Sequence, residues 1–344
     1  MVKINTIYEQ DIKTITNLKC DVQKLKNKTL LITGGTGLIG TYLVDMLLYL
    51  NKEFSLNMKL ILITRNPNLP QKENVTYLVQ DILEPINISE KVDYVIHGAS
   101  NTHPVLYSTK PIETITTNVI GIQNLLEIVK NNTQCKFLFL SSVEIYGEDI
   151  SNNEKGFSEK DFGYLDCNTL RAGYCESKRL GETLCHAYAT QHNIEFTIAR
   201  LCRCYGPTLK SDDSKALSQF LKNAVNSENI VLKSDGNQFY SYLYASDAAT
   251  ALIFLLLQGK NKEAYNVASE KSNITLKDLS LLIAKISDVQ VVFEKPNEIE
   301  KKGYSKATRA ILNPEKIFDL GWSPTYDIKT GIGRTLNQMR RNHV

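Results

Sequence analysis

The sequence predicts an α/β fold: a doubly wound parallel sheet with a smaller C-terminal lobe. Between residue 28 and about residue 205, short apolar runs of strand length alternate with longer segments whose apolar residues recur at helical spacing. The short runs are apolar at successive positions, which is typical of parallel strands buried on both faces. The alternation breaks after Cys204, so we expect a second structural unit there.

The alternating segments divide into strands and long helices. Strands are expected at 29–33, 59–64, 75–79, 92–97, 136–141 and 194–200. Long helices are expected at 38–50, 112–131 and 172–191. This order favours a parallel sheet with helices on both faces. An apolar helix at 247–258 and a short strand at 265–267 are expected beyond it.

A glycine-rich turn follows the first expected strand and indicates a dinucleotide site. The glycines are Gly34, Gly37 and Gly40, and the next helix begins near Leu38 and Ile39. In such a turn the first glycine permits the tight bend, the second lets the backbone approach a pyrophosphate, and the third lets the helix pack on the strand. The free amides at the helix start then face the phosphates. By itself the spacing also fits an ordinary strand-to-helix turn.

These patterns suggest how the chain is divided. Residues 1–27 are expected to form an N-terminal helical extension that docks on the body or on a partner. Its apolar side chains fall near one helical face: Ile4, Ile7, Ile12, Ile15, Leu18, Val22 and Leu25. Residues 28–205 are expected to form the dinucleotide-binding Rossmann domain, to which 241–262 returns. Residues 206–240 and 263–344 are assigned to the substrate-binding lobe.

Composition excludes several classes of partner. The net charge is only +3 and the basic residues are dispersed, which argues against a nucleic-acid surface. The longest apolar run, 251–257, is too short for a membrane span, and the polar N-terminus is unlike a secretory signal. The seven cysteines lack zinc-type spacing and the five histidines are scattered, so we expect reduced thiols, a cytoplasmic protein and no metal site.

Two further stretches carry groups suited to proton transfer. Tyr174 and Lys178 lie four residues apart in an expected helix, so they share a face. An ammonium near a phenol lowers the phenol pKa and makes it a usable base. The strand at 136–141 delivers Ser142 and Glu144 to the sheet edge where the glycine turn opens. Taken singly, these stretches also fit a surface Tyr–Lys pair and a strand end capped by serines.

Taken in order, the motifs resemble the extended short-chain dehydrogenase/reductase family, specifically its nucleotide-sugar epimerase/dehydratase members. The resemblance covers residues 28 to about 340. Besides the glycine turn and the Tyr-x-x-x-Lys pair, four stretches match: Gln80-Asp-Ile82, His97-Gly-Ala-Ser100, the helix around Asn118, and Tyr205-Gly-Pro207.

The resemblance implies an enzyme that uses NAD or NADP and a nucleotide-sugar substrate. Its catalytic residues would be Ser142, Glu144, Tyr174 and Lys178. Tyr174 would remove the proton of the sugar 4-hydroxyl while the nicotinamide takes the C4 hydride, Lys178 would hold the cofactor ribose, and Ser142 would orient the hydroxyl. The implied cofactor contacts are Gly34, Gly37, Leu38, Ile39, Gly40, Arg65, Asp81, Ile82, Ala99, Asn118, Tyr174 and Lys178.

Glu144 bears on which reaction follows the oxidation. The stretch Ser142-Val-Glu-Ile-Tyr-Gly147 resembles dehydratases and uronate decarboxylases more than plain 4-epimerases. A carboxylate beside C5 could take the acidified proton and let the C6 hydroxyl leave, so we expect 4,6-dehydration. Uronate decarboxylation and simple 4-epimerisation stay open, as does a solvated or salt-bridged Glu144 without this role. Val143, where related dehydratases have an Asp, weakens the dehydratase assignment.

Some positions depart from the family pattern. Arg65 follows the second strand where NAD-selective relatives have an Asp, so it could pair with a 2′-phosphate of NADP or be an exposed residue without a role. Tyr240 stands where an Arg usually grips the substrate diphosphate, and Arg203 where Asn or His is usual. We therefore expect Arg203, with Arg309, to supply the missing positive charge.

The resemblance also implies a homodimer formed by the helices at 112–131 and 172–191. A non-catalytic cofactor-binding regulator or scaffold is the alternative to an enzyme.

Overall fold

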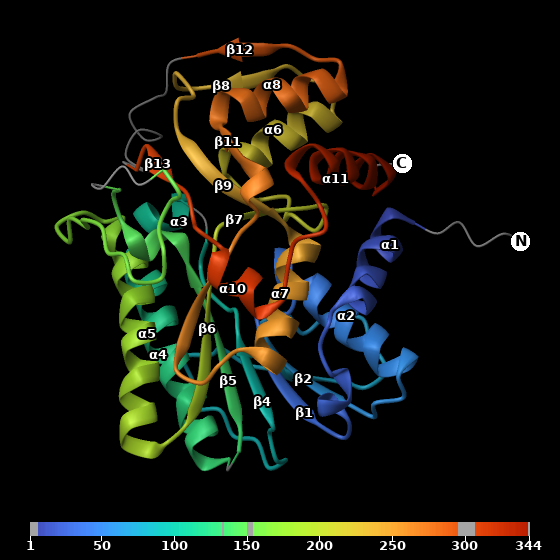
Figure 1. The fold of residues 1–344 in the computed structure, drawn as a ribbon, viewed down its shortest axis with the longest axis vertical. Coiled ribbons are helices and arrows are strands. Elements are labelled where there is room, and N and C mark those ends of the chain that lie inside the picture. Colours follow the sequence, from blue (N-terminus) through green and yellow to red (C-terminus); the bar gives the residue numbers. More distant parts are fainter. Residues whose placement is uncertain (1–5, 103, 133, 150–153, 295–306, 343–344) are drawn as a thin grey trace, which may run out of the picture.

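The fold is built around a seven-stranded parallel sheet, seen in Figure 1. The computed structural model describes residues 6–102, 104–132, 134–149, 154–294 and 307–342. The strand order is β10-β6-β5-β4-β1-β2-β3. The strands are β1 (Thr29–Thr33), β2 (Lys59–Thr64), β3 (Val75–Val79), β4 (Tyr94–His97), β5 (Lys136–Ser142), β6 (Glu195–Leu201) and β10 (Glu263–Val267). The expected α/β class and the doubly wound sheet are confirmed.

Helices cover both faces of this sheet. The helices α2 (Leu38–Glu53) and α7 (Ala245–Gln258) pack together on one face, and α4 (Pro111–Asn131) and α5 (Ala172–His192) on the other (Figure 1). Every residue of α7 except its last is buried, because the helix lies between the sheet and other helices. The strand order reverses between β1 and β4, and the crevice at such a switch point is where ligands of these sheets bind.

The second lobe is smaller and lies beyond the carboxyl ends of the strands (Figure 1). Its sheet joins β11 (Asn273–Thr275), β9 (Phe239–Tyr244) and β13 (Arg309–Ala310), with β7 (Arg203–Tyr205) also paired to β9. A two-stranded sheet joins β8 (Ile230–Leu232) to β12 (Val291–Phe293). Among the residues that the structure describes, this lobe also contains the helices α6 (Ala216–Val225), α8 (Leu276–Ser287) and α11 (Ile328–Asn342).

Residues 263–267 lie in the large sheet, whereas we assigned them to the substrate-binding lobe. They form β10, which pairs in parallel with β6 at the sheet edge. Tyr265 and Val267 are buried there, so the edge position covers apolar side chains that the lobe would expose. The short helix α10 (Glu315–Leu320) packs on β10. The return of the chain to the Rossmann sheet therefore extends past residue 262.

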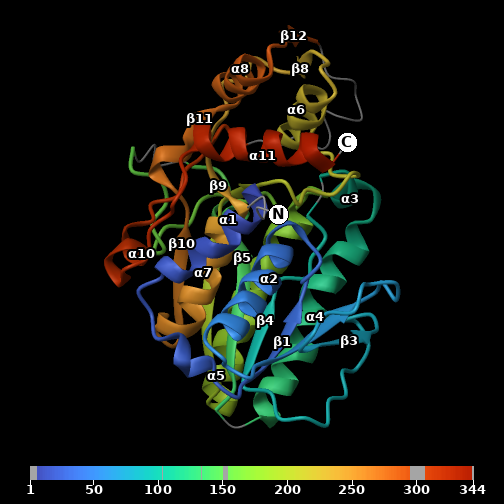
Figure 2. The ribbon, with the colours of Figure 1, turned by 90° about the vertical axis from the view of Figure 1, so that its right-hand side faces the viewer.

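The N-terminal extension docks on the body as three short pieces rather than one helix. These are α1 (Ile7–Lys13) and two 3₁₀ turns, η1 (Thr14–Asn17) and η2 (Val22–Leu25). Ile12, Ile15 and Leu25 are buried as expected, and Ile4 lies outside the described residues. Figure 2 shows α1 beside α2 and near α11.

A buried carboxylate ties this extension to three distant parts of the chain. Asp11 of α1 is fully buried and accepts hydrogen bonds from the hydroxyls of Tyr42, at 2.9 Å, and Tyr244, at 2.6 Å. Its other oxygen accepts from Arg334 of α11, at 2.8 Å from Nε. A buried charge with three donors is stabilised only while all of them stay in place. Asp11 therefore links α1, α2, β9 and α11.

The remaining described elements are short. They are α3 (Pro104–Thr109), η3 (Val143–Tyr146) and η4 (Glu270–Ser272). In the part of the chain that the structure describes, no helix is both long and apolar enough to cross a membrane.

Candidate active site

One large cavity, of about 1020 Å³, opens between the sheet and the smaller lobe. Most of the residues that the sequence singled out line it. These are Gly34, Gly37, Leu38, Ile39, Gly40, Arg65, Asp81, Ile82, Ala99, Ser142, Glu144, Tyr174, Lys178, Arg203 and Tyr240. Asn118 and Arg309 are not among the lining residues.

The glycine turn has the geometry that a pyrophosphate site needs. Gly34 has a φ of +74°, and a Cβ there would lie 2.6 Å from the backbone of Gly98. A Cβ on Gly40 would lie 2.0 Å from the Gly34 carbonyl oxygen. No side chain caps the start of α2, so the first amides of the helix are left for a ligand. The turn therefore fits the phosphates of a dinucleotide.

The end of β2 lacks the acid that would bind a ribose 2′-hydroxyl. The hydroxyl of Thr64 already has a partner nearby in the chain, because it accepts a hydrogen bond from the Asn66 amide at 3.1 Å. The next residue, Arg65, is exposed at the mouth of the cavity. Asp81 lines the same region, and its carboxylate accepts from the Leu83 amide at 3.0 Å. These residues fit either dinucleotide, and Arg65 is placed where it could meet a 2′-phosphate.

Tyr174 and Lys178 lie one helical turn apart on α5, and both are buried in the cavity wall. Burial raises the pKa of the Tyr174 phenol, and the interaction with Ser142 offsets only part of this rise, so the net direction is up. Burial lowers the pKa of the Lys178 ammonium to about 8. Lys178 donates a hydrogen bond to the carbonyl oxygen of Leu140 at 2.8 Å, which aims it along the end of β5.

Tyr107, which the sequence did not single out, packs against the Tyr174 ring. The two ring centroids lie 4.8 Å apart and the planes are 23° from parallel. Tyr107 belongs to α3 and also lines the cavity. Stacking of this kind fixes the orientation of the phenol. No spacing in the sequence relates the two rings, because they come from elements far apart in the chain.

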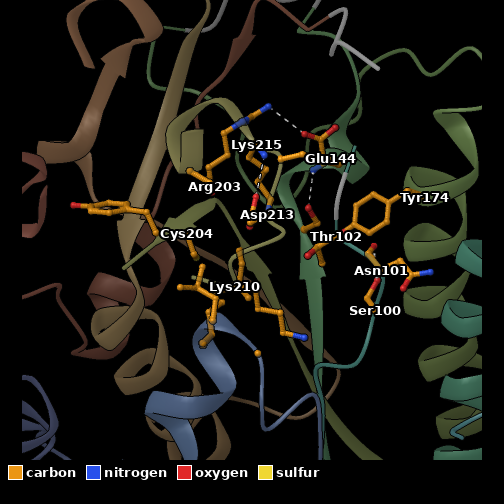
Figure 3. Close-up of a pocket in the computed structure, with 18 of the residues that line it drawn as sticks. Ser100, Asn101, Thr102, Glu144, Tyr174, Arg203, Cys204, Lys210, Asp213 and Lys215 are labelled. Atoms are coloured by element: carbon orange, nitrogen blue, oxygen red, sulfur yellow. Dashed lines mark hydrogen bonds and ion pairs between the residues drawn. The ribbon is translucent and has the colours of Figure 1, made fainter. Parts of the chain in front are cut away.

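Glu144 is held by two guanidinium groups, which we call the arginine pair: Arg171 and Arg203. One carboxylate oxygen accepts from Nη2 of Arg171 at 3.0 Å, and the other from Nη2 of Arg203 at 3.1 Å. Burial raises the pKa of the Glu144 carboxyl, but the arginine pair outweighs it and the net direction is down. Figure 3 shows Arg203 turned toward Glu144, with Tyr174 and Thr102 below them. The sequence left open whether Glu144 is solvated or salt-bridged, and the structure shows that it is salt-bridged.

Arg171 could have been found from the sequence, since it precedes Tyr174 by three residues and so shares its helical face. Its partner Arg203 lies on β7, and its guanidinium carbon stands 3.5 Å from the ring centre of Tyr240. This contact pairs the two positions that depart from the family pattern. Tyr240 donates its hydroxyl to the carbonyl oxygen of Ala307 at 2.9 Å, which fixes the ring under Arg203.

Arg309 lies away from the cavity. It donates a hydrogen bond to the carbonyl oxygen of Glu154 at 2.9 Å, lies 3.5 Å from the Asp149 carboxylate, and stacks on Phe239. β13 pairs with β9 in a register that sets Arg309 opposite Phe239, which accounts for this direction. Other cations that line the cavity from the lobe are Lys210, Lys215 and Lys233, and Lys215 is paired with Asp213 at 2.7 Å.

Asn118 is buried behind the cavity wall and does not line the cavity. It is buried on α4 and donates to the Ser177 hydroxyl at 2.9 Å, and Ser177 precedes Lys178. The amide oxygen of Asn118 has no hydrogen-bond partner within the described residues. Asn118 therefore bears on the position of α5 rather than on the cavity surface.

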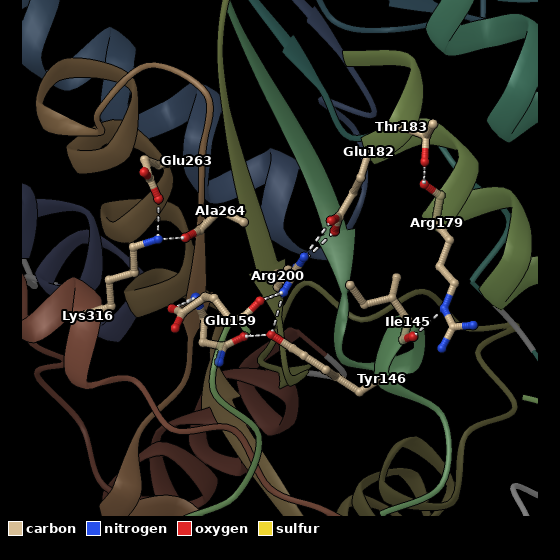
Figure 4. A network of polar contacts seen from close by, with 11 residues as sticks. Ile145, Tyr146, Glu159, Arg179, Glu182, Thr183, Arg200, Glu263, Ala264 and Lys316 are labelled. Carbon is tan, nitrogen blue, oxygen red and sulfur yellow. Dashed lines mark hydrogen bonds and ion pairs between the residues drawn. The ribbon is translucent and has the colours of Figure 1, made fainter. Parts of the chain in front are cut away.

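A network around Arg200 joins the elements that carry the site (Figure 4). Arg200 of β6 forms two hydrogen bonds with Glu182 of α5, at 3.0 and 2.7 Å, and donates to the Tyr146 hydroxyl of η3 at 2.8 Å. Tyr146 in turn donates to Asn266 of β10 at 2.7 Å. Because a buried ion pair with extra hydrogen bonds resists rearrangement, α5 and η3 hold Tyr174 and Ser142 in a fixed relation.

A parallel sheet with a glycine turn at its switch point defines the class: a Rossmann-type dinucleotide-binding protein. Within that class the chain belongs to the NAD dependent epimerase/dehydratase family of enzymes, whose family model matches residues 30–268.

Individual relatives agree with this family. The chain is 29% identical over 321 residues to UDP-glucuronic acid decarboxylase 3 of Arabidopsis thaliana, covering 89% of this chain and 87% of that protein. UDP-glucose 4-epimerase of Thermotoga maritima shares the fold, with a TM-score of 0.80 at 22% identity over 92% of this chain and 100% of that one. The dTDP-glucose 4,6-dehydratase of Streptomyces venezuelae, solved with NAD bound, gives 0.78 at 23% identity, over 92% and 98%.

Proposed function

We propose that this protein binds a nucleotide-diphosphate sugar and oxidises its 4-hydroxyl to a ketone. The observation that carries the proposal is that Ser142, Tyr174 and Lys178 line the same cavity as the glycine turn. A phenol, a hydroxyl and an ammonium side by side can orient an alcohol and take its proton. The family and the names of the relatives support a nucleotide sugar as the substrate.

Binding, orientation and proton transfer are carried out by different residues of the chain. A bound oxidised nicotinamide supplies the hydride acceptor and a positive charge. The glycine turn and the amides of α2 hold the dinucleotide phosphates. Ser142 orients the sugar hydroxyl, and Tyr174 takes its proton. Lys178 lies on the same wall, where its charge favours the phenolate form of Tyr174.

The arginine pair makes Glu144 a weak base. A carboxylate that removes the C5 proton works best with a pKa near the operating pH, whereas the pKa of Glu144 is lowered. This argues against the 4,6-dehydration that we expected from the sequence. We therefore favour decarboxylation of a nucleotide-linked uronic acid, and UDP-glucuronic acid decarboxylases among the relatives support that choice.

Decarboxylation needs no base at C5. After oxidation at C4, the C5–C6 bond breaks, its electron pair moves toward the C4 oxygen, and carbon dioxide leaves. C5 would then take a proton from solvent. A dinucleotide held by the glycine turn would supply the hydride that restores C4, and Tyr174 would return its proton to the C4 oxygen. Dehydration and 4-epimerisation remain the competing outcomes.

We also propose that two copies associate through α4 and α5. Ile112 and Ile120 of α4 and Leu180 of α5 are exposed at 74%, 39% and 42%, which is unusual for large apolar residues on two neighbouring helices. The choice between NAD and NADP, the division into lobes and the cytoplasmic location stay predictions. Arg65 could decide the first of these through a 2′-phosphate.

The test is a panel of nucleotide sugars incubated with the purified protein and NAD or NADP. Product masses separate loss of carbon dioxide, loss of water and an unchanged mass. Repeating the reaction in heavy water shows whether C5 exchanges. Tyr174→Phe is the matched control: it should abolish turnover and leave cofactor binding intact. A protein that binds the cofactor but changes none of the sugars would be the regulator or scaffold, and the proposal would fail.

A further inference from the structure

We infer that the arginine pair binds a carboxylate on the sugar, so that the substrate class is a nucleotide-linked uronic acid. The inference rests on the proposed function and names the residue that selects the sugar. Arg203 is that residue, and it lies in the cavity wall.

The guanidinium group of Arg203 has one donor that the described residues leave unsatisfied. Nη2 of Arg203 is bonded to Glu144, whereas Nη1 is buried and has no hydrogen-bond partner within the described residues. A buried donor without a partner is costly, so such a group marks a place where an acceptor is missing. The side chain as a whole is 21% exposed, and Arg203 lines the cavity.

Arg203 is also part of a cluster of charged side chains. Arg171 and Arg203 together carry two positive charges, and Glu144 supplies one negative charge between them. Both guanidinium groups therefore already hold one carboxylate in the cavity wall. A second carboxylate, on the sugar, could form charge-assisted hydrogen bonds with the remaining donor of Arg203. Glu144 itself demonstrates that a carboxylate fits between the two guanidinium groups.

Glu144 and Arg203 also lie close to the residues assigned to the reaction. Glu144 follows Ser142 by two residues, and its amide donates to the Ser142 hydroxyl at 3.2 Å. Ser142 and Tyr174 line the same cavity. Figure 3 shows Arg203 and Glu144 on the same side of the cavity as Tyr174. The sugar rather than the diphosphate would therefore meet Arg203. Stacking on Tyr240 at 3.5 Å keeps Arg203 on this side.

The sugar carboxylate would share the arginine pair with Glu144 or displace it. The two carboxylates repel each other, so binding of the sugar competes with the Glu144 ion pairs. No bond is made or broken in this step. It is a binding step that precedes the oxidation.

The experiment measures affinity by calorimetry in the Tyr174→Phe background, where the proposed function predicts no turnover. The probes are UDP, UDP-glucose and UDP-glucuronate. We expect UDP-glucuronate to bind at least about 10-fold more tightly than UDP-glucose, in line with a hydrogen bond to a charged group. Arg203→Asn should remove most of this preference and change the affinities for UDP and UDP-glucose by less than about 3-fold. Arg203→Lys, which keeps the charge, should retain part of it.

Arg341→Asn, an exposed arginine near the end of α11, should change none of the three affinities. Glu144→Gln removes the competing charge and should tighten UDP-glucuronate binding; weaker binding would contradict the inference. An equal loss for all three ligands in Arg203→Asn would assign Arg203 to the diphosphate and overturn it. If all three ligands bind equally, the carboxylate assignment fails while the nucleotide site stands. If neither these probes nor their counterparts on other nucleotide bases bind, the proposed function fails and the assignment falls with it.

Discussion

Replacing Lys178 by Met should stabilise the protein in the absence of cofactor. Burial lowers the pKa of Lys178 from 10.5 to about 8, and at about 1.4 kcal/mol per pKa unit this corresponds to about 3 kcal/mol against the charged form in the fold. Met has a similar length and carries no charge. It gives up the hydrogen bond to the Leu140 carbonyl, which costs about 1 kcal/mol. The net expectation at pH 7 is a gain of about 2 kcal/mol in the free energy of unfolding.

The sign of the pH dependence follows from proton binding. Between pH 8 and pH 10.5, the unfolded chain binds more protons at this lysine than the folded protein does. Wild-type stability therefore gains with rising pH in that window, and Lys178→Met lacks this gain. The advantage of the variant should shrink by about 2 kcal/mol between pH 7 and pH 9.5.

Urea unfolding at several pH values measures both quantities, since the midpoint and slope give the free energy. Lys26→Met, at an exposed lysine, is the matched control and should show no pH-dependent difference from wild type. If Lys178→Met is less stable than wild type and the difference does not change with pH, the reasoning from a buried charge is refuted. The variant should also lose turnover, because Lys178 would no longer favour the phenolate.

Three further perturbations test other parts of the structure. Asp11→Ala should lower the free energy of unfolding by about 3–5 kcal/mol in urea, because it leaves Arg334 without its buried partner; an unchanged midpoint would contradict the linking role of α1. Gly40→Ala should abolish NAD binding in calorimetry, because the new Cβ would meet the Gly34 carbonyl 2.0 Å away, and normal binding would refute the geometry of the turn. Leu180→Asp should give a monomer in light scattering where wild type is a dimer; a wild-type monomer would reject the proposed association.

The sheet could be predicted because its signals are local. Most apolar runs of strand length are buried in the structure: β1 is buried at every position, whereas the edge strand β3 is buried only at Val75. Likewise, α2 begins at Leu38, where the glycine pattern sets its start. A strand buried on both faces of a sheet is a run of consecutive apolar residues in the sequence. The strand positions predicted from such runs therefore agree with the observed ones within two residues.

The ion pairs of the site could not be predicted because their members are far apart in the chain. Glu144, Arg171 and Arg203 come from η3, from the start of α5 and from β7. Arg203 and Arg309 were both expected at the substrate diphosphate, because Tyr240 stands where the family usually has an arginine, but the register of β13 turns Arg309 elsewhere. The sequence gives the number of basic side chains, whereas the strand register determines the direction in which each of them points.

The N-terminal extension and β10 show the same limit. The apolar period at residues 7–25 suggested one helical face, yet the chain there folds as three short pieces around the buried Asp11. A single polar residue with partners on three other elements leaves no periodic signal. β10 is similarly short, and its place beside β6 depends on apolar contacts that form only when the chain returns.

The most direct test of the account follows the hydrogen at C4. The protein is mixed with the nucleotide sugar that the panel identifies, carrying hydrogen or deuterium at C4, and the absorbance of reduced nicotinamide is followed over a single turnover. We predict that reduction is slower with deuterium, that the label is retained in the product, and that Tyr174→Phe shows no reduction. Turnover without any reduced nicotinamide and without an isotope effect would contradict oxidation at C4, and with it the role assigned to this cavity.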